Sequence, residues 1–410
     1  MFRHSCSPRP GWKNIIEQEG LIYWETDLPT GEKISYWNES NYYEFSPEEV
    51  ELFEDASTEL NTMARETAAY MASGNDFTAQ QLGLPEGSLE VLQENLTRNP
   101  FTLYGRFDFG FDAVTGDLKM LEYNADTPTG IIEMCSQWNW LEDKFPNTDQ
   151  CNSLYDRLIR QWGRGRFRSG TVHFGYCGEA YPEDRVNVQM LQTCAEQAGL
   201  RTKLLEMQHI GWDAEKKMFV DASGTPDSYN SWGEPQRIDT CFKLYPWEDM
   251  LNEAFGRFIL DDPYSVQWVE PLWKELLSNK VFLAAIHNIY PNHPHILPAQ
   301  LNNPGKMEWW VGKPLHGREG SNIIVESPTH RFTMPGEYGQ EGYVYQEWFD
   351  IPTYDGRYPV IGAWIVGDSP AGLGVRDSSQ PVTDPLCQFV PHVIDSPRPT
   401  QEQVEEWLEN

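Results

Sequence analysis

Four polar side chains, Arg106, Asp108, Glu122 and Asn124, lie on two short segments in which apolar and polar residues alternate. The alternation predicts two β-strands, and a turn that ends on a left-handed Gly116 would join them as a hairpin. With a three-residue loop in that turn, Asp108 faces Glu122 across the ladder. In the same register, Arg106 faces Asn124. Two carboxylates placed in this way repel each other unless a cation lies between them, so the spacing predicts a cation site.

The side chains at this predicted site would offer oxygen ligands to the cation. Oxygen ligands from Asp, Glu and Asn select a hard ion such as Mg2+, which keeps several waters and commonly bridges nucleotide phosphates. We therefore expect Asp108, Glu122 and Asn124 to bind Mg2+. Arg106 beside the ion would neutralise phosphate or developing carboxylate charge. The alternative is an exposed hairpin face with ordinary polar residues in a different register.

The residues after the hairpin lead into an apolar helical pattern over 131–141. Asp126 or Thr127 is a natural helix cap there, with Pro128 in the first turn. Free N–H groups and the helix dipole at such a start can hold a substrate carboxylate. Asp126, Thr127 and Thr129 are therefore candidate substrate-binding residues, and simple capping of the helix is the alternative.

Basic residues able to reach a phosphate are spread over the second half of the chain. Lys280 precedes an apolar stretch, Lys313 lies in a short strand pattern, and Arg376 lies at the end of a predicted hairpin strand. Arg318 belongs to a glycine-rich turn over 316–322, whose backbone is able to cover a phosphate. Each lone basic residue is more often solvated than catalytic, so none identifies a site by itself.

Several elements must fold together to position these candidates, and the patterns predict both helices and strands. Ser46 and Glu49 form a capping box that starts an amphipathic helix running to about residue 73. Segments 171–177, 185–198 and 202–207 predict one βαβ unit of a parallel sheet. The other expected elements are a hairpin over 20–45, a helix over 89–96, a loop or small hairpin over 213–235, a helical stretch around 247–258, strands and turns over 309–332, a hairpin over 360–376 and an acidic helical tail.

Composition limits the classes of function. The chain has 410 residues, a length that predicts two or three domains, and 31 basic against 62 acidic side chains give a net charge of −31. A nucleic acid is excluded as the default partner, because phosphate backbones need a basic footprint. The acidic balance suits a cationic substrate, or simply solubility. The 16 tryptophans leave open a glycoside hydrolase that uses paired carboxylates.

Signs of a membrane or secreted protein are missing from the sequence. The longest aliphatic run near the middle, 281–286, is far shorter than the roughly 20 apolar residues that span a bilayer, so no membrane contact is expected. The first residues lack the apolar core of a signal peptide. The seven cysteines are scattered and form no Cys-x-x-Cys pair, so we expect free thiols in a cytoplasmic protein.

Nine short motifs occur along the chain in the order found in one known family. They are Arg9–Trp12, Gly105–Phe109, Glu122–Asp126, Trp268–Pro271, Ser278–Lys280, Pro291–His293, Gly312–Pro314, Gly317–Arg318 and Tyr345–Gln346. Together they resemble the glutathionylspermidine synthase family, whose synthetase domain is an ATP-grasp ligase. The resemblance covers nearly the whole chain, which is similar to the shorter members named acid–amine ligases that lack an N-terminal amidase domain.

This resemblance implies a mixed α+β or α/β fold, namely a circularly permuted ATP-grasp fold with an inserted pre-ATP-grasp-like α/β domain and a small lid. The permuted order agrees with the sequence, in which the carboxylate ligands precede the lysines. Residues 1–165 would hold N-terminal helices and the metal-binding part of the core. Residues 166–240 would form the inserted domain. Residues 241–410 would form the nucleotide-binding part, with the lid at about 275–345.

The resemblance also implies a reaction and a set of site residues. ATP, with Mg2+, would phosphorylate a substrate carboxylate, and an amine would then displace the phosphate to form an amide. The acid would be glutathione or a peptide, and the amine a polyamine. By position, Asp108, Glu122 and Asn124 would bind Mg2+, Arg106 and Arg376 would contact the transferred phosphoryl group, Lys280, Lys313 and Arg318 would contact the nucleotide phosphates, and Gln346 and Trp348 would line the adenine pocket.

Two departures from the family pattern concern the acid substrate. Members that use glutathione carry a Cys where Gly130 stands and a Thr near Leu244. Both positions belong to the glutathione side of the pocket, so the nucleotide half of the site matches the family while the acid-binding half differs. The main alternative is an ATP-grasp protein that binds nucleotide without catalysis.

Overall fold

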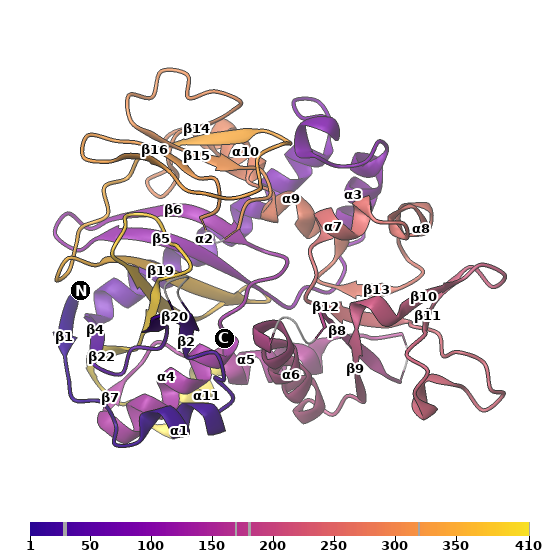
Figure 1. Ribbon diagram of the computed structural model, residues 1–410, viewed down its shortest axis with the longest axis horizontal. Helices are drawn as coiled ribbons and strands as arrows, with labels where there is room; N and C mark the ends of the chain where they lie inside the picture. Colours follow the sequence, from indigo (N-terminus) through magenta and orange to yellow (C-terminus); the bar gives the residue numbers. More distant parts are fainter. Residues whose placement is uncertain (28–30, 169, 179–181, 319, 410) are drawn as a thin grey trace.

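The computed structural model describes residues 1–27, 31–168, 170–178, 182–318 and 320–409. Within these residues the strands form two five-stranded sheets, two four-stranded sheets and two separate hairpins. Helices pack on the larger sheets, so the fold is mixed α/β (Figure 1). Among the helices of these residues, none combines the length and apolar character that crossing a bilayer requires. The seven cysteines are free thiols, as expected from the sequence.

The central sheet is antiparallel and carries most of the predicted site residues. Its strand order is β21-β20-β19-β5-β6. The strands are β5 (Tyr104–Asp112), β6 (Asp117–Asn124), β19 (Tyr358–Val366), β20 (Ser369–Ser378) and β21 (Gln388–Val390). Because β19 lies between β5 and β20, residues distant in sequence become neighbours in this sheet.

The β5–β6 hairpin confirms the predicted facing pairs but not the predicted loop. Asp108 pairs with Glu122, and Arg106 pairs with Asn124. Asp112 pairs with Asp117, however, so the loop has four residues, 113–116, rather than three. A β-bulge between the site and the tip compensates for the extra loop residue. Gly116 has the expected positive φ of 78°.

The bulge also decides which face of the sheet Glu122 occupies. Phe109 pairs with Met120 and Asp108 with Glu122, which leaves Leu121 without a partner in the ladder. Met120 points into the core, and strict alternation would send Glu122 to that same face. The additional residue reverses the alternation, so Glu122 lines the cavity described below.

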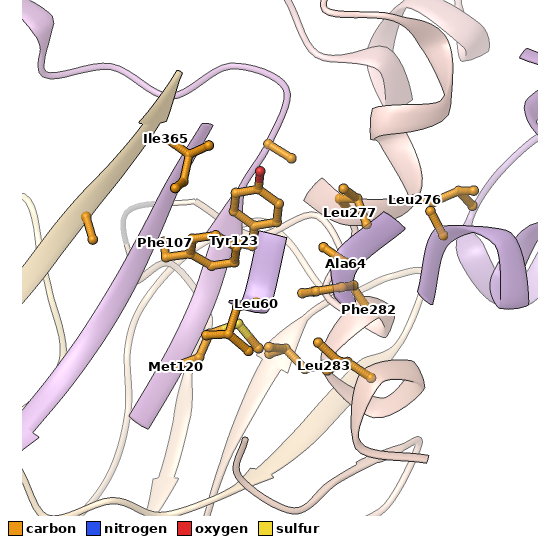
Figure 2. Close-up of a cluster of buried hydrophobic side chains, with 14 of the residues drawn as sticks. Leu60, Ala64, Phe107, Met120, Tyr123, Leu276, Leu277, Phe282, Leu283 and Ile365 are labelled. Atoms are coloured by element: carbon orange, nitrogen blue, oxygen red, sulfur yellow. The ribbon is translucent and has the colours of Figure 1, made fainter. Parts of the chain in front are cut away.

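The opposite face of the hairpin packs against helices (Figure 2). The rings of Phe107 and Tyr123 stack with their centroids 3.8 Å apart. Leu60 and Ala64 of α2 (Pro47–Ala72) pack beside them, with Phe282 of α10 (Val281–Ile289). The capping box predicted at the start of α2 is present, and α9 (Glu275–Ser278) adds two leucines to the same core.

A second, parallel sheet has the order β13-β12-β8-β9. The predicted βαβ unit is confirmed by β8 (Val172–Tyr176), α6 (Pro182–Gln197) and β9 (Thr202–Glu206). The remaining strands are β12 (Thr240–Lys243) and β13 (Gln267–Val269), which pair in parallel. The carboxyl ends of such strands meet at one edge, where ligands bind in open α/β sheets.

A third sheet, β14-β18-β15-β16-β17, lies over the β5–β6 hairpin at the top of Figure 1. Its strands are β14 (Ala299–Leu301), β15 (Trp310–Pro314), β16 (Ile324–Glu326), β17 (Arg331–Thr333) and β18 (Tyr343–Glu347). The backbone N–H of Met120 donates to the carbonyl of His295 at 2.8 Å, which joins the hairpin to the segment before β14.

The described residues also form a fourth sheet, two hairpins and further helices. The fourth sheet, β1-β4-β22-β7, contains Phe2–Ser5, Asn41–Phe45, His392–Pro397 and Thr148–Asp149. The two hairpins are β2 (Glu25–Asp27) with β3 (Lys33–Ser35), and β10 (Ile210–Asp213) with β11 (Met218–Asp221). The other helices are α1 (Trp12–Gln18), α3 (Ser88–Thr97), α4 (Ile131–Lys144), α5 (Leu154–Arg164), α7 (Trp247–Asn252), α8 (Gly256–Asp261) and α11 (Gln401–Glu409).

A hairpin and a helical stretch expected from the sequence correspond to elements of the structure. The hairpin expected within 20–45 is confirmed by β2 and β3, while residues 28–30 of its turn lie outside the described residues. The helical stretch around 247–258 is divided into α7 and α8, because Glu253 after α7 has an extended ψ of 172°. The chain thereby turns between the two helices.

We predict that Phe282→Ala lowers the free energy of unfolding by about 3–5 kcal/mol, because the ring is buried and its loss leaves a cavity. Phe2→Ala is the matched control: the Phe2 side chain is 65% exposed and its removal should cost less than about 1 kcal/mol. Urea unfolding followed by circular dichroism measures both values. Equal losses would contradict the packing in Figure 2.

Candidate functional site

A cavity of about 990 Å³ lies where the central sheet, the parallel sheet and the β14–β18 sheet meet. It is lined by almost all of the site residues expected from the sequence. These are Arg106, Asp108, Glu122, Asn124, Thr127, Thr129, Lys280, Lys313, Arg318, Gln346, Trp348 and Arg376. The fold therefore brings together residues that are up to 270 positions apart in the chain.

Asp108 is the centre of the charged end of this cavity. Its Oδ1 accepts a hydrogen bond from Arg106 Nε at 2.7 Å, and its Oδ2 accepts one from Arg106 Nη2 at 3.0 Å. Arg376 Nη2 reaches Oδ2 at 2.6 Å from the other side. Burial alone would lower the pKa of Arg376, but the charge of Asp108 raises it above its ordinary value. The Arg376 guanidinium therefore stays charged, and both guanidinium groups point at the same carboxylate.

Glu122 and Asn124 complete the predicted ligand set. Asn124 Nδ2 donates to Asp108 Oδ2 at 3.2 Å and to Glu122 Oε1 at 3.0 Å. Lys280 Nζ lies 3.3 Å from Glu122 Oε2. Burial would raise the pKa of Glu122, but the charges of Lys280 and Lys313 hold it below its ordinary value. Glu122 is therefore ionised at neutral pH.

The arrangement of these oxygens fits a hard cation. Asp108 Oδ2 and Glu122 Oε1 both lie within hydrogen-bond distance of the same amide group of Asn124. The amide of Asn124 carries its oxygen on the side away from the nitrogen, and a half-turn about the Cβ–Cγ bond exchanges Oδ1 and Nδ2. In that orientation Asn124 and the two carboxylates would offer three oxygen ligands to one ion.

Lys313 lies on β15 and reaches down to the β-bulge of the hairpin. Its Nζ donates to the carbonyl oxygen of Leu121, the unpaired bulge residue, at 2.7 Å, and to Gln346 Oε1 at 2.8 Å. Burial lowers the pKa of Lys313 to about 8, although the charge of Glu122 opposes this effect. The bulge thus serves two purposes, since it turns Glu122 to the cavity and frees a carbonyl for Lys313.

We call Arg106, Arg376, Lys280 and Lys313 the cation cluster. Two carboxylates, Asp108 and Glu122, lie among these four cations, so this end of the cavity carries two excess positive charges at neutral pH. The whole chain has a net charge of −31. A partly buried excess of cations in an acidic protein favours an anionic ligand with several charges.

Arg318, Gln346 and Trp348 lie on the β14–β18 side of the cavity. Arg318 Nη2 pairs with Glu248 Oε1 at 2.9 Å, and Lys280 Nζ donates to the carbonyl of Gly317 at 2.8 Å. The Gly-rich turn expected over 316–322 is therefore held next to the cation cluster, although residue 319 lies outside the described residues. Gln346 Nε2 donates to the carbonyl of Met120 at 3.1 Å, so its side chain is part of the cavity floor.

The expected helix cap after the hairpin is wrong. Helix α4 begins at Ile131 with Gly130 as its N-cap, so neither Asp126 nor Thr127 caps it and Pro128 precedes the first turn. Asn187 Oδ1 instead accepts the backbone N–H groups of Gly130 and Ile131 at 3.2 and 3.0 Å. Two of the N–H groups at this helix start are thus already satisfied by a side chain of α6.

Asp126 is the one expected site residue that does not line the cavity. Its carboxylate is buried, pairs with Lys243 Nζ at 2.7 Å and accepts the backbone N–H of Trp247 at 3.1 Å. This pair fixes the loop before α4 to the end of β12. Thr127 and Thr129 face the cavity, and the carbonyl of Thr129 accepts a hydrogen bond from Arg106 Nη1 at 2.7 Å.

The cavity is also lined by acidic residues that sequence reasoning did not identify. Glu183 and Asp184 of α6 and Asp249 of α7 line it, together with Tyr23. No local motif separates these three acids from the other 59 in the chain. Their only sequence signal is that each lies shortly after a strand of the parallel sheet, at its carboxyl edge.

The amino-acid sequence of the chain is similar to that of known proteins. The sequence model described as glutathionylspermidine synthase preATP-grasp matches residues 3–395. A protein of Haemophilus influenzae named "Putative acid--amine ligase" is 36% identical over 399 residues, which cover 94% of this chain and 97% of the relative. A glutathione synthetase-like effector of Globodera pallida has a TM-score of 0.49 at 9% identity, covering 95% of this chain and 98% of the effector.

Two longer relatives are less similar. Trypanothione synthetase of Crithidia fasciculata is 26% identical over 373 residues, covering 84% of this chain and 55% of the relative. The bifunctional glutathionylspermidine synthetase/amidase of Escherichia coli is 24% identical over 328 residues, covering 72% of this chain and 50% of the relative. The match thus spans about half the length of these two relatives. Because the family match extends over residues 3–395, the chain belongs to the glutathionylspermidine synthase family.

Proposed function

We propose that this chain is an ATP- and Mg2+-dependent ligase that joins a carboxylate to an amine as an amide. The observation that carries this proposal is the cation cluster, which leaves two excess positive charges in a cavity large enough for a nucleotide and a second substrate. Phosphoryl transfer depends mainly on positioning and on neutralising charge by metal ions, Lys and Arg. The names of the relatives, which include an acid–amine ligase, support the same reaction.

The nucleotide would lie between the cation cluster and the β14–β18 sheet. Lys280 and Lys313 would contact its phosphates, with Arg318 beside them, and Gln346 and Trp348 would lie along the adenine. Asp108, Glu122 and Asn124 would hold Mg2+ through the three oxygens described above. Bound Mg2+ would neutralise charge on the phosphates. These assignments correspond to a circularly permuted ATP-grasp fold with a lid over about 275–345.

The reaction has two steps. An oxygen of the substrate carboxylate attacks the terminal phosphorus of ATP, the bond from that phosphorus to the bridging oxygen breaks, and ADP leaves. The amine nitrogen then attacks the acyl carbon, the carbon–oxygen bond breaks, and phosphate departs with the electron pair while the nitrogen loses a proton. Arg106 and Arg376 both pair with Asp108, and both would contact the transferred phosphoryl group.

The two substrates would enter the part of the cavity away from the nucleotide. Thr127, Thr129 and Gly130 border the place where a carboxylate would meet Arg106. The acids in the lining, Glu183 and Asp184 among them, suit a positively charged amine. A peptide or glutathione as the acid and a polyamine as the amine are the substrates that the family suggests.

The domain boundaries expected from the sequence fit this proposal. Residues 1–165 contain the β5–β6 hairpin, 166–240 contain β8, α6 and β9, and 241–410 contain the β14–β18 sheet.

A glycoside hydrolase needs a carboxylic acid with a raised pKa, whereas the pKa of Glu122 is lowered. The cation cluster would have no role in that reaction.

The direct test measures release of ADP and phosphate from MgATP. Glutathione, amino acids and short peptides are each combined with spermidine and simple amines. We expect turnover that requires one acid and one amine together. ATP binding without turnover in any combination would instead favour the nucleotide-binding alternative without catalysis.

We predict that Glu122→Gln lowers kcat/KM by about 100-fold or more, because it removes a charged oxygen ligand and leaves the fold in place. Glu90→Gln is the matched control, since Glu90 is exposed on α3 and should leave turnover unchanged. The Mg2+ concentration for half-maximal rate should rise in Glu122→Gln only. Full activity of that variant would contradict the metal assignment.

The pKa of Lys313 predicts how the rate depends on pH. Above about pH 8 the side chain loses its proton, so kcat/KM for ATP should fall about tenfold per further pH unit. Lys313→Arg keeps its charge at these pH values and should flatten this part of the profile. Lys306→Arg, an exposed control, should keep the original profile. A profile that is unchanged in Lys313→Arg would show that another group titrates.

A further inference from the structure

Glu248, Glu275 and His316 come together at a place that is not part of the lining of the main cavity. Glu248 lies on α7, Glu275 begins α9 and His316 follows β15, so three separate elements meet there. Each side chain offers one oxygen or nitrogen atom, and these three atoms all lie within 4.8 Å of one another. Among the described residues, no other three His, Cys, Asp or Glu side chains bring such atoms this close. We call these three residues the Glu–Glu–His cluster.

Glu275 is the member of the cluster whose charge is not balanced. Its side chain is fully buried, and Asn279 Nδ2 donates to its Oε1 at 3.4 Å. Its Oε2 is also buried and has no hydrogen-bond partner among the described residues. Glu248, in contrast, pairs with Arg318 Nη2 at 2.9 Å. Burial and the charges of Glu248 and Asp126 raise the pKa of Glu275 well above its ordinary value. A buried carboxylate in this setting needs either a proton or a cation.

His316 is held so that one of its ring nitrogens stays free. Its Nε2 lies 3.2 Å from the carbonyl oxygen of Leu82, and a carbonyl only accepts, so Nε2 carries the proton. Nδ1 then keeps its lone pair. A Cβ on Gly83 would lie 2.7 Å from Nε2, so a side chain at that position would displace the ring. Histidines that bind metals are held in the same way, through a hydrogen bond from their other nitrogen.

The carbonyl of Leu82 also positions Glu275. Asn279 Nδ2 donates to this carbonyl at 2.8 Å and to Glu275 Oε1 at 3.4 Å. One peptide group therefore holds two members of the cluster, His316 directly and Glu275 through Asn279. Outer contacts of this kind orient the atoms that bind a metal ion, and they are absent from a chance grouping of acids on a surface.

We propose that the Glu–Glu–His cluster binds Zn2+ or a similar divalent transition-metal ion, at a site separate from the Mg2+ site. One imidazole and two carboxylates are the three protein ligands of a zinc site with an open fourth position. The ring nitrogen favours Zn2+ over Mg2+, which prefers oxygen ligands. The ion would neutralise Glu275 in place of a proton. It would also fasten α7 and α9 to the segment that carries Arg318.

Titration calorimetry of the full chain with Zn2+ tests the proposal. Excess Mg2+ is present, so that sites made only of oxygen ligands do not compete. We expect a single Zn2+ per chain, bound about 100-fold or more weakly in Glu275→Gln and in His316→Ala, because each variant loses a ligand. Glu90→Gln, exposed on α3, and His209→Ala, outside the cluster, are the matched controls and should keep the affinity of the unmodified chain.

Thermal unfolding shows whether the variants fold and supplies a second readout. Zn2+ should raise the Tm of the unmodified chain and of both controls, because an ion that binds the folded state stabilises it. The Tm of Glu275→Gln and of His316→Ala should not respond to Zn2+. Two variants are used because either change alone could disturb packing around Leu82.

The outcomes decide between an ion and a proton at the cluster. If no Zn2+ binds in excess Mg2+, the proposal is overturned, and a proton between Glu275 and Glu248 is left to balance the charge. Equal Zn2+ binding in the folded variants and in the unmodified chain would also overturn it, as an adventitious ion only, held by thiols for example. The proposed function is tested separately by MgATP binding and turnover, whose failure would leave the Zn2+ result standing.

Discussion

The contact on which the site depends is the carboxylate of Asp108 between the guanidinium groups of Arg106 and Arg376. Two arginines would otherwise repel each other, and each would turn toward solvent. Strand β19 lies between the two strands that carry them, and Gly362 pairs with Asp108 across the ladder. A Cβ on Gly362 would lie 2.8 Å from Arg106 Cδ, so a glycine is needed for the arginine to lie flat over the sheet.

Side chains of both charges line the cavity. The cation cluster shares the lining with Glu183, Asp184 and Asp249. A negatively charged acid and a positively charged amine would each find side chains of opposite charge there. The net charge of −31 does not describe this lining, because most of the acidic residues lie outside the cavity.

Local patterns predicted the parts of the fold that depend on local sequence. The βαβ unit and the capping box of α2 follow from periodicity and capping residues. The facing pairs of the hairpin were predicted correctly only because the bulge compensates for a loop one residue longer than expected. The pairing of Asp126 with Lys243, 117 positions away, has no local signal, and for that reason the helix cap after the hairpin was predicted wrongly. The contact of Arg376 with Asp108, across 268 positions, likewise depends on how β19 orders the sheet.

The β-bulge at Leu121 has a consequence for how this hairpin can change during evolution. A side chain alternates between faces with every residue, and Glu122 faces the cavity only because the unpaired Leu121 interrupts this alternation, so losing the bulge while keeping Leu121 would send the carboxylate into the core. It would also withdraw the carbonyl that receives Lys313. The tip beyond Asp112 is free of these constraints, since Val114 is 93% exposed there. Changes in length should therefore accumulate at the tip, while the spacing from Met120 to Asn124 stays fixed.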